Sequence, residues 1–248
     1  MRTDLAQGLR DALKSFAGRE IAAAIRLATS ARAVDTDVDA MRGRLELLRE
    51  RLLSRPGMVS GKPDLVQRWT YAPRAKSSER LMLWGLSRAC LLEVADRLYS
   101  AADTSAPGAT MLLSLAHTRG MAISAGTLVR PGERPHLVGI GVDCEPQGRM
   151  PSAETMRRVA HPDDHLGSLD SITIWAAKEA CLKADPRPGM ELSAYALKCY
   201  REIGEGGPLQ AIGDQVDFRV FVSGLQSFRV AVAMAYASHP LAVVHERG

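Results

Sequence analysis

The chain has 248 residues, of which 46% are hydrophobic and 24% are charged, with four cysteines and a formal net charge of +4 at pH 7. This length and composition fit one large globular domain or two small ones. No apolar run approaches the ~20 residues of a membrane span. The first ten residues are polar and lack the apolar region of a secretory signal peptide. We therefore expect a cytoplasmic protein with reduced thiols and an acidic partner.

Apolar residues at helical spacing predict that much of the first hundred residues is helical. The stripes favour helices over residues 4–29, 38–53 and 78–98, with a proline-containing loop over 55–73. In the third helix Arg80, Trp84 and Arg88 follow one another at intervals of four, so that they share one face. Taken alone, this face is better explained by a surface helix with ordinary solvated arginines than by a binding role.

The middle of the chain is predicted to form strands. Residues 111–115 and 121–128 read as a strand–turn–strand with His117 at its bend. Side chains alternate over residues 137–145, which predicts a further strand with one apolar face. Its apolar face holds Val138, Ile140, Val142 and Cys144, and its opposite face holds Leu137, Gly139, Gly141, Asp143 and Glu145.

The second face of that strand is unusual. A glycine inside a strand marks a place where a ligand or another backbone comes close. Asp143 and Glu145 project together beside the glycines, and two adjacent carboxylates repel unless a cation lies between them. A divalent cation is the natural candidate, although an edge strand that ends in a solvated acidic turn fits this stretch equally well.

A helix over residues 171–184 brings further charges. Glu179 and Lys183 form an i, i+4 pair at the edge of its apolar stripe, whereas Lys178 falls inside the stripe and must either snorkel or meet an anion. A third carboxylate and two lysines together indicate a phosphate and magnesium site. The remaining predicted elements are a helix over 153–159, the turn 161–165, and strands over 192–200, 216–222 and 227–237.

The two motifs together resemble a known family. G-V-D-C-E at 141–145, followed by W-A-A-K-E-A-C-L-K at 175–183, is similar to the signature pair of the 4′-phosphopantetheinyl transferases. S-L-A-H-T-R-G at 114–120, the basic helix and the chain length are similar to the larger, surfactin-synthetase-activating type. The first serine of that type's S-H-S turn is replaced by Ala116, and its G-K-P segment is absent before the turn.

The resemblance implies an α+β fold of two similar halves related by a pseudo-twofold axis. The first half would span residues 1–130 and include a helical extension over about 1–55. The second half, residues 131–248, would carry the metal site, and coenzyme A would bind between the halves. Such a protein would be a monomer.

The resemblance also implies an activity. The enzyme would transfer the 4′-phosphopantetheine arm of coenzyme A to a serine of an apo acyl or peptidyl carrier protein and release 3′,5′-ADP. The implied Mg²⁺ ligands are Asp143, Glu145 and Glu179. Lys183 would stabilise the pyrophosphate or the departing ADP, and the other implied phosphate contacts are Arg80, Arg88, His117 and Lys178.

The base for the attacking serine stays open between Glu179, acting through a metal-bound water, and Asp163 or Asp164 in the loop. The implied partners are coenzyme A and an acidic carrier protein, with no nucleic acid and no membrane. A non-catalytic family member that binds coenzyme A or a carrier is the main alternative. A nucleic-acid-binding module over residues 1–98 is more distant, because that segment holds no recognised motif.

Overall fold

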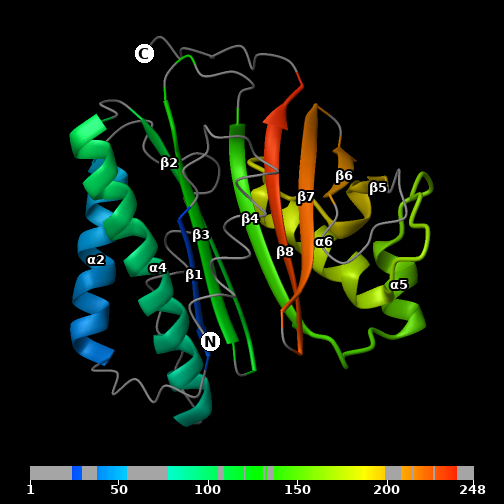
Figure 1. The fold of residues 1–248 in the computed structure, drawn as a ribbon, viewed down its shortest axis with the longest axis horizontal. Coiled ribbons are helices and arrows are strands. Elements are labelled where there is room, and N and C mark those ends of the chain that lie inside the picture. The colour runs from blue at the N-terminus through cyan, green and yellow to red at the C-terminus, as the bar shows by residue number, and fades with distance from the viewer. Residues whose placement is uncertain are drawn as a thin grey trace.

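The computed structural model describes residues 24–29, 38–54, 78–105, 109–119, 121–130, 132, 137–198, 208–213, 215–225 and 227–238. These residues form a mixed α+β fold with four α-helices and two antiparallel sheets (Figure 1). No α-helix among them combines the length and the apolar character that crossing a membrane requires.

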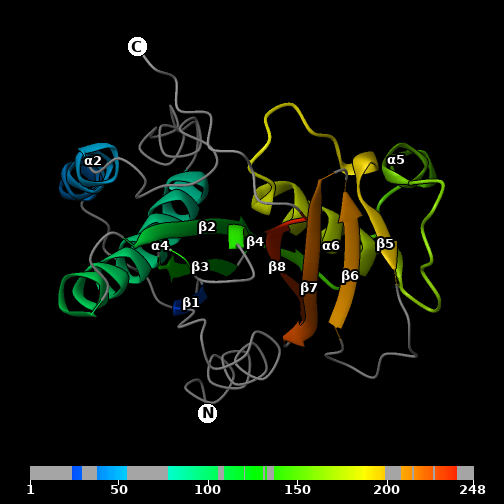
Figure 2. The ribbon, with the colours of Figure 1, turned by 90° about the horizontal axis from the view of Figure 1, so that it is seen from above.

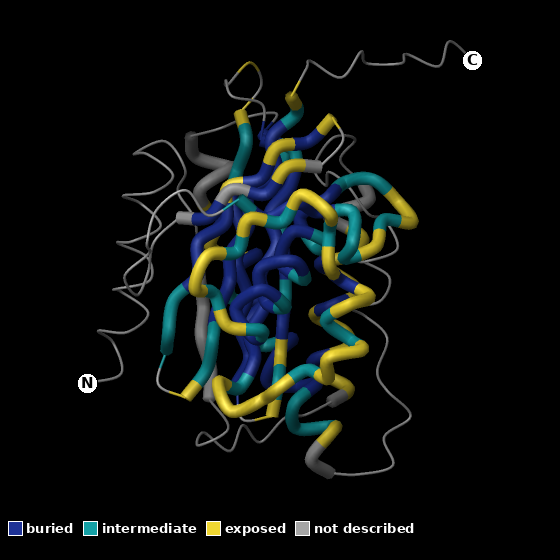
Figure 3. Tube along the Cα trace, turned by 90° about the vertical axis from the view of Figure 1, so that its right-hand side faces the viewer, coloured by how far each residue is buried: buried dark blue, intermediate teal, exposed yellow. Residues whose placement is uncertain are grey.

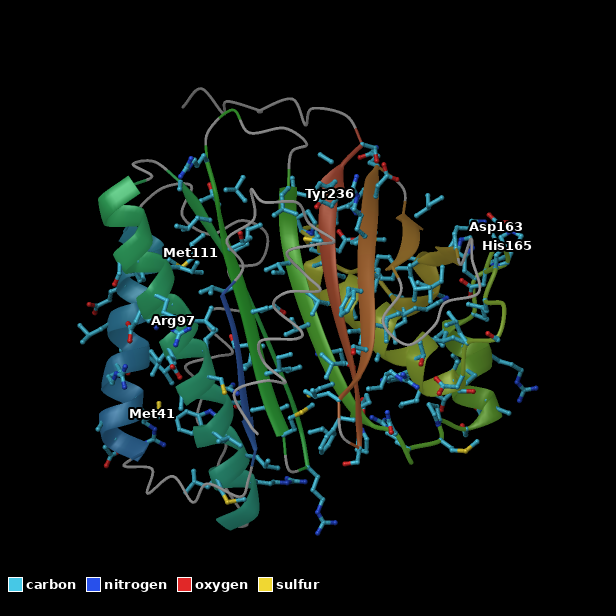
Figure 4. The ribbon with its side chains drawn as sticks, in the orientation of Figure 1. Met41, Arg97, Met111, Asp163, His165 and Tyr236 are labelled. Atoms are coloured by element: carbon cyan, nitrogen blue, oxygen red, sulfur yellow. The ribbon has the colours of Figure 1, made fainter. Side chains whose placement is uncertain are left out.

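The smaller sheet has three strands in the order β1-β3-β2, which are Ala24–Thr29, Met121–Val129 and Thr110–Thr118. Helix α4 (Ser78–Ser105) covers one face of it, and α2 (Val38–Ser54) packs on α4 from outside (Figure 2). Met41 of α2 and Met111 of β2, both labelled in Figure 4, belong to one buried cluster with Leu91 of α4.

The larger sheet has five strands in the order β4-β8-β7-β6-β5, which are Leu137–Pro146, Phe228–Ala237, Val216–Leu225, Pro208–Gly213 and Ala196–Lys198. Helix α6 (Ser171–Ala184) crosses one face of this sheet. A short helix, α5 (Ala153–Val159), and the 3-10 turn η1 (Leu192–Ala194) lie against α6 at its outer side.

The two sheets share a core. Ile123 of β3, Val142 of β4 and Val232 of β8 are buried in one cluster between them. The edge strands β2 and β4 lie side by side, and Val142 N donates a hydrogen bond of 3.0 Å to Ser114 Oγ. Figure 3 shows the buried part of the chain gathered in the middle of the molecule, with the exposed segments around it.

The two sheets share part of their connectivity around α4 and α6, although in the larger sheet β5 and β6 come between α6 and the last two strands. In each case one strand precedes the helix and an antiparallel pair follows it, and the first strand pairs with the last strand of that pair. The resulting orders are β1-β3-β2 and β4-β8-β7, with β6 and β5 added beyond β7.

Several predicted elements are confirmed. The helices over 153–159 and 171–184 have the predicted bounds, the helix over 38–53 ends one residue later, and the one over 78–98 continues to Ser105. The predicted strand over 192–200 is instead the turn η1 followed by the short strand β5. Strand β6 was not predicted. The predicted loop 55–73 and residues 4–23 of the first predicted helix lie outside the described residues.

The helix predicted to continue through residue 29 is wrong at its end, where the chain forms β1. Ile25 and Leu27 fit a strand alternation as well as a helical stripe. Antiparallel pairing with β3 decides between them, because a short segment takes the conformation that its hydrogen-bonding neighbour supports. The predicted faces of β4 also need one correction. A register irregularity between Leu137 and Gly139 places Leu137 in the core between the sheets and Val138 against the α6 side.

Candidate functional site

Helix α6 lies unusually close to β4 because glycines form the surface beneath it. A Cβ atom on Gly141 would stand 1.9 Å from Ala180 O, and one on Gly139 would stand 1.7 Å from Ala184 O. The backbone that approaches these glycines is therefore that of α6. Of the two neighbours that a strand glycine allows, a ligand or another backbone, the structure shows the second. The close approach explains how residues of α6 come within reach of the β4 carboxylates.

Two buried carboxylates follow these glycines on β4. The side chains of Asp143 and Glu145 are only 8% and 10% exposed. Lys183 Nζ of α6 donates to Asp143 Oδ1 at 2.7 Å, and the guanidinium of Arg149 donates to Glu145 Oε1. The second oxygens, Asp143 Oδ2 and Glu145 Oε2, are buried and have no hydrogen-bond partner within the described part of the chain.

Glu179 of α6 completes the acidic group. Burial raises the pKa of its carboxyl, and the negative charges of Asp143 and Glu145 raise that pKa further. The positive charges of Lys183 and Arg149 oppose this rise. Glu179 therefore lies within electrostatic reach of both β4 carboxylates and of both cations that hold them.

The chemistry of this group fits a hard divalent cation. Mg²⁺ takes oxygen ligands, keeps several waters and needs few protein carboxylates. Two buried carboxylate oxygens without partners are costly unless a cation meets them. As they stand, however, no three acidic, His or Cys side chains among the described residues are gathered tightly enough to hold a metal ion. The acidic side chains would have to close around a bound ion.

The smaller sheet and its helix supply positive charge to the same region. Arg88 of α4 is buried with its guanidinium 5.7 Å from the centroid of the Trp84 ring, and burial lowers its pKa to about 10. Partial burial of the His117 imidazole, at the end of β2, lowers the pKa of that ring, and the charges of Arg88 and Lys183 lower it further. The lowered pKa favours the neutral imidazole, and His117 lies near cations from both sides of the junction.

Arg80 lies two helical turns before Arg88, near the beginning of α4, where its residue is exposed. The structure thus separates the two predicted phosphate contacts by environment, because Arg88 is buried beside Trp84 and Arg80 faces solvent.

Lys178 meets an anion of the protein itself. Its fully buried ammonium donates to Asp164 Oδ2 and to Val159 O, each at 2.7 Å. Asp164 Oδ1 in turn accepts a hydrogen bond of 2.8 Å from Leu197 N of β5. These bonds join three parts of the chain, which are α6, the loop that follows α5, and β5. They occupy the Lys178 ammonium and the Asp164 carboxylate, which were predicted to contact phosphate and to act as a base.

The loop that carries Asp163 and Asp164 lies at the far edge of the larger sheet. Lys198 Nζ donates to Asp163 O, and His165 forms a β-bridge with Lys198 of β5. In Figure 4 the labelled Asp163 and His165 lie in this outer loop. Because β5 and β4 are at opposite edges of the sheet, the structure does not bring Asp163 to the carboxylates of β4.

Sequence reasoning missed Arg149. It lies in the turn after β4, with its guanidinium carbon 5.5 Å from the centroid of the Trp175 ring of α6. The turn is closed by a hydrogen bond from Arg149 N to Pro146 O. No periodic pattern indicates such a contact, although the adjacent Gly148 is a turn signal that marks where the chain reverses.

No known protein-family model matches the chain, and no curated protein matches it either.

Proposed function

We propose that the protein is a 4′-phosphopantetheinyl transferase, which moves the phosphopantetheine arm of coenzyme A to a serine of an apo carrier protein and releases 3′,5′-ADP. The observation that carries the proposal is the pair of buried carboxylates, Asp143 and Glu145, each with one oxygen that no hydrogen bond satisfies. They face Glu179 and Lys183 of α6 in the order of the family's signature motifs.

Asp143, Glu145 and Glu179 would hold Mg²⁺, which supplies neutralisation of the negative charge on a pyrophosphate. Lys183 is a mobile point charge beside Asp143 and would bind a phosphate oxygen of the substrate or of the departing ADP. His117, whose lowered pKa favours the neutral ring, would donate one ring N–H to a phosphate, and the buried Arg88 beside it would offer a planar, bidentate cation.

Glu179 is our choice for the base. In the reaction a bond forms between the serine oxygen and the phosphorus next to the arm, the bond from that phosphorus to the ADP oxygen breaks, and the serine proton needs an acceptor. Glu179 lies within electrostatic reach of Asp143 and Lys183, and it would accept the proton through a water molecule. Asp163 and Asp164 are bound to β5 instead, and we assign Asp164 and Lys178 a structural role.

We further propose that the two halves are related by a pseudo-twofold axis and that coenzyme A binds between them. The shared connectivity around α4 and α6 supports the relation, with a division near residue 130 between β3 and β4. His117 and Arg88 before this division, and Asp143 and Lys183 after it, support binding at the junction. Of the proposed helical extension, α2 is the described helix.

The net charge of +4 favours an acidic carrier protein as the partner of a cytoplasmic monomer. One observation favours a second candidate, a non-catalytic member that binds coenzyme A or a carrier. Lys183 and Arg149 already neutralise one oxygen each of Asp143 and Glu145, and a protein without metal would keep these pairs closed.

The test combines the purified protein with coenzyme A, Mg²⁺ and apo acyl or peptidyl carrier proteins, and follows the carrier by mass spectrometry. We expect the carrier to gain one phosphopantetheine. Glu179→Gln and Asp143→Ala should abolish the gain while circular dichroism stays that of the wild type. Asp217→Asn, a matched change of an exposed carboxylate on β7, should not affect it.

Absence of the mass gain on every carrier, with coenzyme A binding retained, would establish the non-catalytic candidate. Near-normal turnover of either site variant would refute the assignment of the carboxylates.

A further inference from the structure

The two cations that hold the β4 carboxylates come from different kinds of structure. Lys183 belongs to the last turn of α6, which packs directly on β4. Arg149 belongs to the turn after β4 and is 48% exposed, against 27% for Lys183. Its neighbour Gly148 is surrounded by open space. The guanidinium is therefore the cation with the greater freedom to move.

Arg149 also makes a second contact at the same time. Its guanidinium carbon lies 5.5 Å from the centroid of the Trp175 ring, within the range of a cation–π interaction. This contact is made to α6 and is independent of the bond to Glu145. If the bond to Glu145 opened, the ring would still hold the side chain near the site.

The acidic group is under-neutralised by its own cations. Asp143, Glu145 and Glu179 supply three carboxylates, and Lys183 and Arg149 supply two positive charges. Glu145 presents one oxygen to Arg149 and keeps the other buried without a partner. An incoming cation at this carboxylate meets Arg149 as its direct competitor.

We propose that Arg149 is an exchangeable counter-ion of Glu145, which a divalent cation displaces from Glu145 when it binds the Asp143–Glu145–Glu179 group, while the Trp175 ring keeps the side chain at the site. The inference deepens the proposed function and rests on its metal site. Arg149 would thus lower the affinity of the empty site for the metal, and it would keep Glu145 neutralised until the metal arrives.

The test titrates the full-length protein with Mn²⁺ alone, without coenzyme A or carrier, and follows free Mn²⁺ by electron paramagnetic resonance. We expect Arg149→Gln to bind Mn²⁺ about tenfold more tightly, because a charge-assisted hydrogen bond no longer competes with the ion. Arg149→Lys should fall between this variant and the wild type. The matched control is Arg158→Gln, which removes the same charge from an exposed pair on α5 and should change the affinity by less than about twofold.

A second readout follows Trp175 itself. Addition of Mg²⁺ should change tryptophan emission in the wild type, and the change should be absent in both Trp175→Phe and Arg149→Gln. A persisting change in Arg149→Gln, or equal Mn²⁺ affinities of Arg149→Gln and the wild type, would overturn the exchange. Absence of Mn²⁺ binding by both proteins would overturn the exchange and the metal site together. Tighter binding by Arg149→Gln without transfer by the wild type would refute only the proposed function.

Discussion

Replacement of Gly141 by alanine should be among the most damaging small changes in this protein. The new Cβ would stand 1.9 Å from Ala180 O and 2.6 Å from Ala184 N. Both atoms belong to the backbone of α6, so no side-chain rotation can relieve the clash. Either α6 must move away from the sheet or β4 must bend.

The expected cost follows from that geometry. Extra methyl groups in packed cores cost about 1–3 kcal/mol, and more where the surroundings are rigid. Because the clashing atoms are backbone, we expect Gly141→Ala to lower the free energy of unfolding by at least ~3 kcal/mol. A displaced α6 would also carry Lys183 and Glu179 away from Asp143, and would break the 2.7 Å contact between Lys183 and Asp143.

Urea unfolding followed by circular dichroism measures this loss. The matched control is Gly148→Ala, where an added Cβ meets nothing within 4 Å, and its free energy of unfolding should equal that of the wild type within about 0.5 kcal/mol. If Gly141→Ala unfolds with the free energy of the control, α6 does not rest on the glycines, and the close approach that assembles the carboxylates is refuted.

Two other predictions concern charged groups. Lys178→Met leaves Asp164 buried without its counter-ion and should lower the free energy of unfolding in urea by about 3–5 kcal/mol. The double variant with Asp164→Asn should recover part of this loss. A loss below about 1 kcal/mol in the single variant would contradict the buried pair. The pKa of His117 should lie below 6.5 in an NMR titration and should rise in Lys183→Met. The pKa of His117 is lower in the folded protein than in the unfolded chain. The contribution of the neutral ring to the free energy of unfolding is therefore complete above pH 6.5 and is lost as the pH falls through the folded pKa. His117→Gln should consequently lose less stability than the wild type between about pH 7 and 5. A His117 pKa at or above 6.5 would contradict its placement near Arg88 and Lys183.

The parts of the fold that depend on local periodicity were predictable from the sequence. The bounds of α6 follow from its apolar stripe and from Asp170, whose side chain caps Thr173 N at 2.8 Å. The strand β4 follows from its alternation. Strand β1 was not predictable, because its partner β3 lies about a hundred residues later and a single sequence does not reveal that pairing.

At the candidate site the sequence indicated which residues require a close neighbour, but it did not identify that neighbour. The glycines of β4 implied that something comes close, and the helical wheel implied that Lys178 requires an anion. That the close neighbour is α6, and that the anion is Asp164, depends on tertiary packing. Arg149 escaped notice for the same reason, because its contact with Trp175 joins a turn to a helix that begins more than twenty residues later.

The hydrogen bond from Val142 N to Ser114 Oγ has a consequence for fragments of this protein. In the described part of the chain β4 is an edge strand of the larger sheet, and β2 lies against that edge. A fragment that began at β4 would carry every proposed metal ligand, but it would expose this strand edge together with the apolar residues of the shared core. Unpaired edges of that kind recruit other chains. Such a fragment should aggregate, and the smaller sheet therefore protects the strand that carries Asp143 and Glu145.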